Sequence, residues 1–103
     1  MAIILPYTNG AGVDAGKAYH RVVRVIYLNS GESTAEVEVY FDKANAVKGS
    51  DPMDTYSTSF MMNVNKGANN VKEQAYAAVK SKTQVVDSKG RVVAIDFSKA
   101  QDD

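Results

Sequence analysis

The stretch of sequence that decides the fold is Ala35-Glu36-Val37-Glu38-Val39-Tyr40-Phe41. Apolar and polar side chains alternate along it, so that the alanine, the valines and the phenylalanine share one face and the glutamates share the other. A period of two is the signature of a β-strand that buries only one face. The stretch therefore predicts a sheet with one side on the core and the other in water.

A second strand is predicted just before this one, over residues 18–28, where tyrosine, valine and isoleucine dominate. Asn29-Ser30-Gly31 supplies a turn between the two strands, because glycine adopts a positive φ without strain. A three-residue turn places Arg24 opposite Glu36, which pairs opposite charges across the hairpin. The same register gathers on one face Tyr19, Val23, Val25 and Tyr27 with Ala35, Val37, Val39 and Phe41.

The rest of the chain predicts more strands and one helix. Asn70 is a typical N-cap, and Glu73 three positions later completes a capping box. The helix that follows carries an apolar stripe at helical spacing. The predicted elements are a polar loop over 42–54 with a helical turn near Lys43 to Val47, a strand over 55–64, a helix over 71–81, a hairpin of strands over 84–86 and 91–97, and a frayed tail over 98–103.

These elements predict an α+β fold, in which one helix packs on a face of an antiparallel β-sheet of four to six strands. The chain has 103 residues, which suffice for one domain. Its first sixteen residues contain three glycines and few apolar anchors. We therefore expect a flexible N-terminal arm over residues 1–16 and a single β-rich domain over residues 17–103.

Charge and composition exclude several classes of function. Twelve basic and twelve acidic residues cancel, so the chain lacks the basic surplus that nucleic-acid binding requires. It contains no cysteine, which excludes disulfides and thiolate metal sites. No apolar run approaches the roughly 20 residues that span a bilayer. We expect neither nucleic acid nor membrane among its partners.

Candidate catalytic and metal-binding residues are few. His20, the only histidine, falls inside a predicted strand without an evident nucleophile beside it. One histidine cannot supply the three or four ligands of a zinc site. Asp51-Pro52-Met53-Asp54 carries two carboxylates, but this composition is typical of a turn and the spacing matches no calcium loop. We expect no catalytic, cofactor-binding or metal site, and a protein that is not an enzyme.

Three stretches carry a family resemblance. They are Ala18-Tyr19-His20-Arg21-Val22-Val23, Tyr56-Ser57-Thr58-Ser59-Phe60 and Asn69-Asn70-Val71-Lys72-Glu73-Gln74-Ala75-Tyr76. In order and character they resemble two strands and a helix of small structural proteins of tailed bacteriophages, and the similarity extends over residues 17–81. The Leu-Pro-Glu-Phe-like ending of that group is missing, because Ser81-Lys82-Thr83 leads into a strand instead.

The resemblance implies a non-enzymatic virion protein that docks on other phage virion proteins, in a homo-oligomeric or multi-copy arrangement. It implies synthesis in the bacterial cytoplasm and a final location in the virion. A tail or neck position is favoured, and a capsid decoration (cement) protein is the alternative within this class. A soluble regulatory module that binds a host protein is the alternative outside it.

Docking residues are expected mainly in the N-terminal arm. A flexible segment with an apolar tip can fold on binding, which points to Ile3, Ile4 and Leu5. Tyr7 adds an aromatic residue of the type enriched at interfaces. Met61, beside Phe60, offers an adaptable apolar contact.

Overall fold

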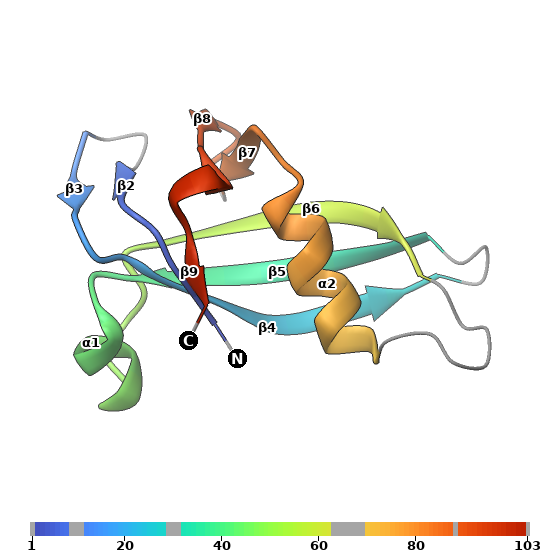
Figure 1. Ribbon diagram of the computed structural model, residues 1–103, viewed down its shortest axis with the longest axis horizontal. Helices are drawn as coiled ribbons and strands as arrows, with labels where there is room; N and C mark the ends of the chain where they lie inside the picture. The colour runs from blue at the N-terminus through green and yellow to red at the C-terminus, as the bar shows by residue number, and fades with distance from the viewer. Residues whose placement is uncertain (1, 9–11, 29–31, 63–69, 88, 103) are drawn as a thin grey trace.

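A curled antiparallel β-sheet forms the body of the protein (Figure 1). The computed structural model describes residues 2–8, 12–28, 32–62, 70–87 and 89–102. The sheet has seven strands in the order β8-β7-β6-β5-β4-β1-β9. Their bounds are β1 (Ile3–Ile4), β4 (Tyr19–Tyr27), β5 (Glu32–Tyr40), β6 (Asp54–Met61), β7 (Gln84–Asp87), β8 (Val92–Ala94) and β9 (Gln101–Asp102).

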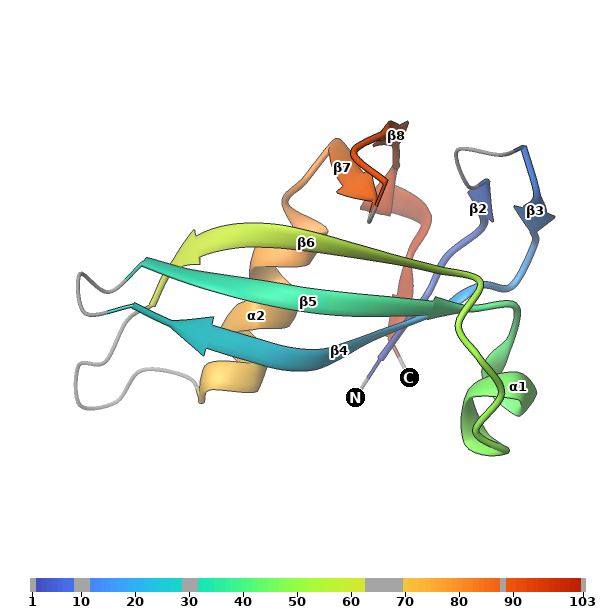
Figure 2. The same cartoon turned by 180° about the vertical axis from the view of Figure 1, so that it is seen from behind.

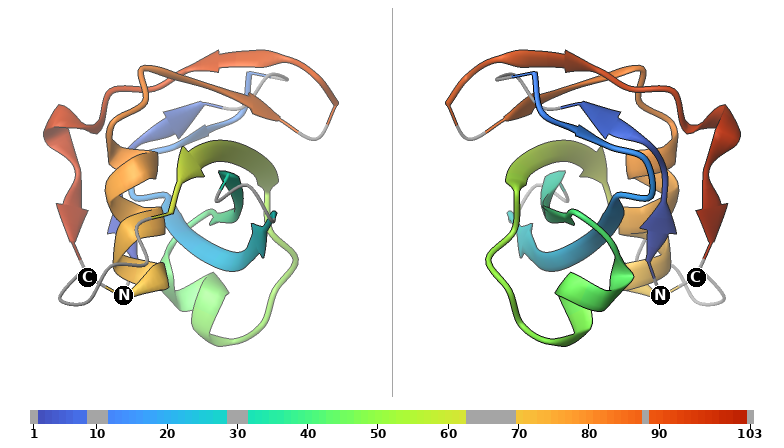
Figure 3. Two further views of the ribbon diagram at one scale, coloured as in Figure 1. Left: turned by 90° about the vertical axis from the view of Figure 1, so that its right-hand side faces the viewer. Right: turned by 90° about the vertical axis from the view of Figure 1, so that its left-hand side faces the viewer.

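The sheet bends into a half-barrel around a single long helix, α2 (Val71–Lys80), as the end-on views of Figure 3 show. We call the side of the sheet that α2 covers the core face, and the opposite side, seen in Figure 2, the outer face. A second, two-stranded sheet pairs β2 (Tyr7–Thr8) with β3 (Asp14–Ala15). Two short helical segments, α1 (Lys43–Val47) and η1 (Phe97–Lys99), complete the described fold.

The predicted α+β class is wrong, because the fold is mostly β. The main sheet has seven strands where four to six were expected, a second sheet accompanies it, and α2 is the only helix of the described residues that exceeds two turns. The extra strands come from the chain ends, including the predicted frayed tail, where β9 pairs with β1. Two-residue strands are too short to show a period of two, so only long-range pairing reveals them.

The prediction of a flexible N-terminal arm was also wrong. β1 lies inside the sheet between β4 and β9, with Ile3 opposite His20 and Asp102. The side chains of Ile3, Leu5 and Tyr7 are at most 3% exposed. An apolar segment of this kind is stabilised by burial in its own core, which leaves no reason for it to stay loose. Residues 1 and 9–11 of the predicted arm lie outside the described residues.

The hairpin of β4 and β5 confirms the predicted Arg24–Glu36 pair and corrects its apolar partners. Arg24 lies opposite Glu36, but Val22 and not Val23 lies opposite Val37, because the register shifts between Val22 and Arg24. This β-bulge adds one residue to β4 and reverses the faces on either side of it. The predicted turn at residues 29–31 lies outside the described residues.

Helix α2 confirms the predicted start and closes the core. Asn70 Oδ1 accepts a hydrogen bond from the Glu73 N–H at 2.9 Å, as an N-cap does. Ala75, Tyr76 and Val79 are buried against the core face. The Tyr76 hydroxyl accepts the N–H of Val22 at 3.0 Å. β1 pairs with β4 only at Tyr19 and His20, so it leaves the N–H of Val22 without a strand partner. The hydroxyl of Tyr76 accepts this N–H and thereby holds the helix against β4 beside the bulge.

A second, smaller apolar cluster lies on the outer face under α1. It joins Ala2, Tyr19, Tyr40 and Ala46, with the half-buried Ile4 beside them. Asp42 caps α1, since its Oδ1 accepts the Asn45 N–H at 2.9 Å. The helical turn predicted at this position is thereby confirmed. Because α1 covers this part of the outer face, Tyr19 and Tyr40 are buried there and not exposed to solvent.

Candidate docking surface

The three long strands extend beyond the body at one end of the longest axis of the molecule (Figure 1), whose extents are 40 × 27 × 26 Å. At this end Tyr27 pairs with Ser33, and Ser33 pairs with Phe60. One residue further, the Leu28 N–H donates to the Glu32 carbonyl at 2.9 Å, and Glu32 pairs with Met61. The strand pairing thus brings β4 and β6 together across β5.

Four apolar side chains at this end are exposed, and we call them the distal tip: Ile26, Tyr27, Leu28 and Met61. Their exposed fractions are 40%, 51%, 50% and 68% in that order. Because successive strand residues point to opposite faces, the distal tip presents apolar surface on both sides of the sheet. Groups of large apolar residues that stay in water mark interaction surfaces more often than isolated ones do.

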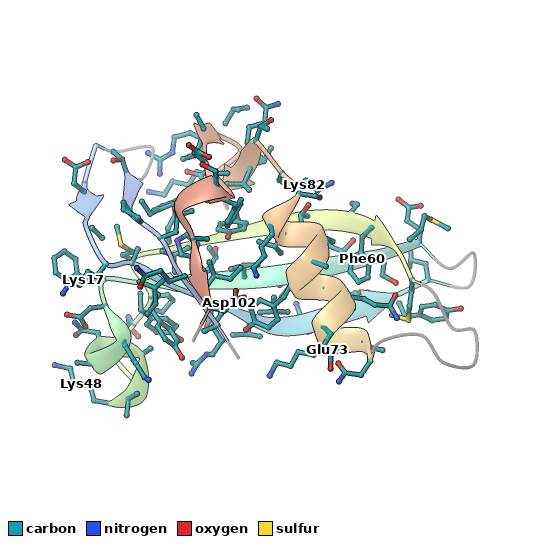
Figure 4. All side chains as sticks on the ribbon, viewed as in Figure 1. Lys17, Lys48, Phe60, Glu73, Lys82 and Asp102 are labelled. Atoms are coloured by element: carbon teal, nitrogen blue, oxygen red, sulfur yellow. The ribbon has the colours of Figure 1, made fainter. Side chains whose placement is uncertain are left out.

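The position of α2 explains why the distal tip is uncovered. The helix begins at Val71, which lines a shallow hollow together with Val22, Val25 and Lys72. In the part of the chain that the structure describes, the helix therefore covers the core face only up to the bulge. Figure 4 shows that Phe60 lies on the distal half of the sheet, whereas Lys17 and Lys48 lie at the opposite end of the molecule.

A charged pair borders the distal tip. Arg24 donates two hydrogen bonds to Glu36, at 2.7 and 2.9 Å, in the bidentate geometry that favours this pairing. The hydrogen bond from Arg24 lowers the pKa of Glu36 below its ordinary value. Both side chains remain exposed to solvent, with exposed fractions of 64% and 32%. An apolar centre with a polar margin is the usual anatomy of a protein–protein interface.

The structure does not bring the predicted docking residues together. Ile3, Leu5 and Tyr7 are buried in the core, and Ile4 is half-buried under α1. Only Met61 is exposed, and it belongs to the distal tip. The other three members were missed because they belong to a predicted strand whose end carries no sign of exposure, and the length of sheet that α2 covers is not visible in the sequence.

His20 lies near the start of β4 and is completely buried. Its Nε2 donates to the Leu5 carbonyl at 3.2 Å, because a carbonyl can only accept. Because the buried ring is neutral at pH 7, its Nδ1 carries no proton and accepts from the Tyr56 hydroxyl at 3.0 Å. Burial lowers the pKa of His20 to about 4, although the bond to Leu5 opposes this. The side chain thus ties the N-terminal segment to β6.

The remaining buried polar groups also have partners within the fold. Tyr7 donates to Asp54 Oδ2 at 2.6 Å, and burial followed by this bond raises the pKa of Tyr7. Asp87 accepts from the backbone N–H groups of Lys89 and Arg91 and from the Arg91 guanidinium at 2.7 Å. Burial alone would raise the pKa of Asp87, but these bonds outweigh it and lower the pKa. The carboxylates thereby stabilise turns and strand ends.

The described residues form neither a cluster of metal ligands nor a membrane-spanning helix. Within residues 2–8, 12–28, 32–62, 70–87 and 89–102, no three histidine, aspartate or glutamate side chains come close enough to hold a metal ion together. Asp54 of the predicted turn is engaged by Tyr7 and by the Thr55 N–H. None of the described helices has the length and apolar character required to cross a membrane.

Comparison of the chain with protein families, with curated proteins and with solved structures gives no match.

Proposed function

We propose that this chain is a non-enzymatic structural protein of a tailed-bacteriophage virion and that it docks on another virion protein through the distal tip. The observation that carries the proposal is the exposure of Ile26, Tyr27, Leu28 and Met61 at one end of the long axis. The family resemblance over residues 17–81 supplies the virion context. A tail or neck position is the one we propose, and capsid decoration is the alternative.

The buried polar groups support a role without chemistry. The histidine is closed off from solvent and neutral, and both of its nitrogens serve the fold. A general base must reach the proton that it abstracts from a substrate. The distal tip, in contrast, combines an aromatic residue and a methionine with aliphatic side chains, which are well suited to a protein partner.

The proposal is tested by removing the apolar surface of the distal tip. Tyr27→Ser combined with Met61→Ser should leave the domain folded, because both side chains are largely exposed. Incorporation into particles assembled with the variant supplied in trans should fall about tenfold or more, since truncated interface anchors each cost more than about 1 kcal/mol. Quantitative mass spectrometry of purified particles measures the incorporation.

Val47→Ser is the matched control, because Val47 is 75% exposed in α1, at the end of the molecule away from the distal tip (Figure 1). It should be incorporated like the unaltered chain. Equal incorporation of the double variant would reject the distal tip as the docking surface, and absence of the unaltered chain from purified particles would reject the virion role altogether. Its abundance relative to the capsid protein separates a tail or neck position from shell decoration.

A further inference from the structure

The two edges of the seven-stranded sheet differ in how they are protected. At one edge, β9 is two residues long and carries Asp102, which forms an ion pair with Lys80. Charge and short length on an edge strand discourage pairing with another chain. At the other edge, β8 consists of Val92, Val93 and Ala94, with no charge, no proline and no bulge in its pairing. Of these two described edge strands, β9 carries a charged side chain and β8 carries none.

The backbone of β8 presents hydrogen-bonding groups to solvent. The Ile95 N–H donates to the Thr83 carbonyl at 3.0 Å, and the Asp87 N–H donates to the Arg91 carbonyl at 2.9 Å. Because antiparallel ladders alternate, the residues of β8 that bond to β7 are Arg91, Val93 and Ile95. The N–H and carbonyl groups of Val92 and Ala94 consequently point away from the sheet.

The side chains of this edge favour an apolar neighbour. Val92 is 63% exposed on the outer face, beside Val86 of β7, which is 49% exposed. The charge of Arg91, which precedes β8, is neutralised by the buried carboxylate of Asp87 at 2.7 Å, and Asp14 and Asp96 line the hollow beside the other end of β8. The edge therefore exposes unpaired backbone N–H and carbonyl groups and the side chain of Val92. β8 itself carries no charged residue that would repel an identical strand.

The edge is also accessible. The end-on views of Figure 3 place β8 at the periphery of the half-barrel. A hollow of about 380 Å³ separates the C-terminal end of β8 from the small sheet of β2 and β3, with Ala94 and Ile95 on one side and Tyr7 and Ala15 on the other.

We propose that a second copy of this chain pairs antiparallel along β8, with Val93 opposite Val93 of the second copy. Val92 then lies opposite Ala94 of the other copy, and the two residues exchange two backbone hydrogen bonds. The two-fold axis generates the equivalent pair between Ala94 and Val92 of the other copy. The same surface serves both copies, as closed symmetric dimers require. The net charge of zero removes long-range repulsion between the copies. The distal tip stays free, so this dimer does not depend on the proposed function.

The test is sedimentation velocity of the full chain over a wide concentration series. The unaltered chain should shift from monomer to dimer with rising concentration. Ala94→Pro removes one outward N–H from each copy while leaving the ladder to β7 intact, and should weaken dimerisation about tenfold or more. Val92→Lys introduces the charge that edge strands use against pairing and should have a similar effect without changing the backbone. Val47→Lys, far from the edge, controls for net charge.

Hydrogen exchange identifies the edge directly. The amide hydrogens of Val92 and Ala94 should exchange more slowly as concentration rises, whereas that of Val93, already bonded to β7, should not change. A chain that stays monomeric at every concentration would overturn the proposal. A dimer that both Ala94→Pro and Val92→Lys leave unchanged would also overturn it, because such a dimer would use another surface. Pairing of this edge with a different protein and never with a second copy would overturn it as well.

Discussion

His20 is the only histidine of the sequence, and its side chain has a structural role in the fold. Its two ring nitrogens join the N-terminal segment to β6 through Leu5 and Tyr56. The rings of Tyr7 and Phe97 pack around it, with centroids 5.4 and 6.2 Å away. Tyr7 and Tyr56 are the titratable groups that face it, and both are neutral because burial raises the pKa of each. No opposite charge among the described residues compensates an imidazolium at this position.

The stability of the fold should therefore depend on pH through His20. The pKa of His20 is about 4 in the folded protein and about 6.5 in the unfolded chain, so the unfolded chain binds the proton first. Stability is fully present above about pH 6.5 and declines as the pH falls toward 4, by about 3 kcal/mol in all at 1.36 kcal/mol per pKa unit. Urea unfolding at a series of pH values between 7 and 4 measures this.

His20→Gln is the control for this prediction. The variant keeps a hydrogen-bonding side chain but cannot titrate, so its stability should be lower at pH 7 yet nearly independent of pH over the same interval. The pKa values of Glu36, Asp42 and Asp87 are also lowered, so these carboxyls withdraw stability only as the pH falls below their ordinary values of 4.5 and 3.8, and the interval between about pH 7 and 5 reports His20. A variant that loses stability with the same slope as the unaltered chain would show that another group is responsible.

At the scale of elements, the N-terminal strand is a structural part of the sheet. β1 lies between β4 and β9, and Ile3 is 1% exposed. Ile3→Ala should cost about 2–5 kcal/mol of unfolding free energy, because it leaves a cavity in the core. Deletion of residues 1–8 should abolish cooperative unfolding, since it removes β1, which joins β9 to the sheet, and the carbonyl of Leu5 that bonds to His20. Thermal unfolding monitored by circular dichroism checks both.

Val47→Ala is the reference for the N-terminal predictions, because its side chain is 75% exposed. It should change stability by less than about 0.5 kcal/mol. If the chain without residues 1–8 unfolded cooperatively at the same temperature as the complete chain, the N-terminal segment would be the dispensable arm that the sequence indicated, and not a strand of the fold.

The same elements show how far the sequence predicts this fold. Alternation along β5 predicted the strand, and the charges of Arg24 and Glu36 predicted its pairing, because both signals are local. The capping residues of α2 predicted its start for the same reason. The bulge after Val22 was not predicted, since an extra residue leaves no mark in a run of valines. The half-barrel was not predicted either, because β1 and β9 are two residues long and are defined by pairing between distant parts of the chain, β1 with β4 and β9 with β1.

The candidate docking surface was predictable only in part. Met61 was predicted as a docking residue, because it adjoins Phe60 and offers an adaptable apolar contact. Ile26, Tyr27 and Leu28 look like an ordinary strand end in the sequence. Their exposure depends on where α2 begins relative to the sheet, which is a property of tertiary packing.

At the scale of the whole molecule, two separate surfaces are available for assembly. The distal tip lies at one end of the long axis, whereas β8 lies at the edge of the half-barrel (Figures 1 and 3). The distal tip offers apolar side chains, and the edge offers backbone groups. A protein with two such surfaces can join a copy of itself and a different partner at once, which suits a component of a larger particle.

The most direct test of the central claim is a cryo-electron microscopy reconstruction of an intact particle that contains this chain. The proposed function predicts density for the half-barrel at the tail or neck, with Tyr27, Leu28 and Met61 buried against a neighbouring virion protein. Density on the outside of the shell would instead identify a decoration protein. A particle without density for the chain, or with the distal tip facing solvent, would contradict the account.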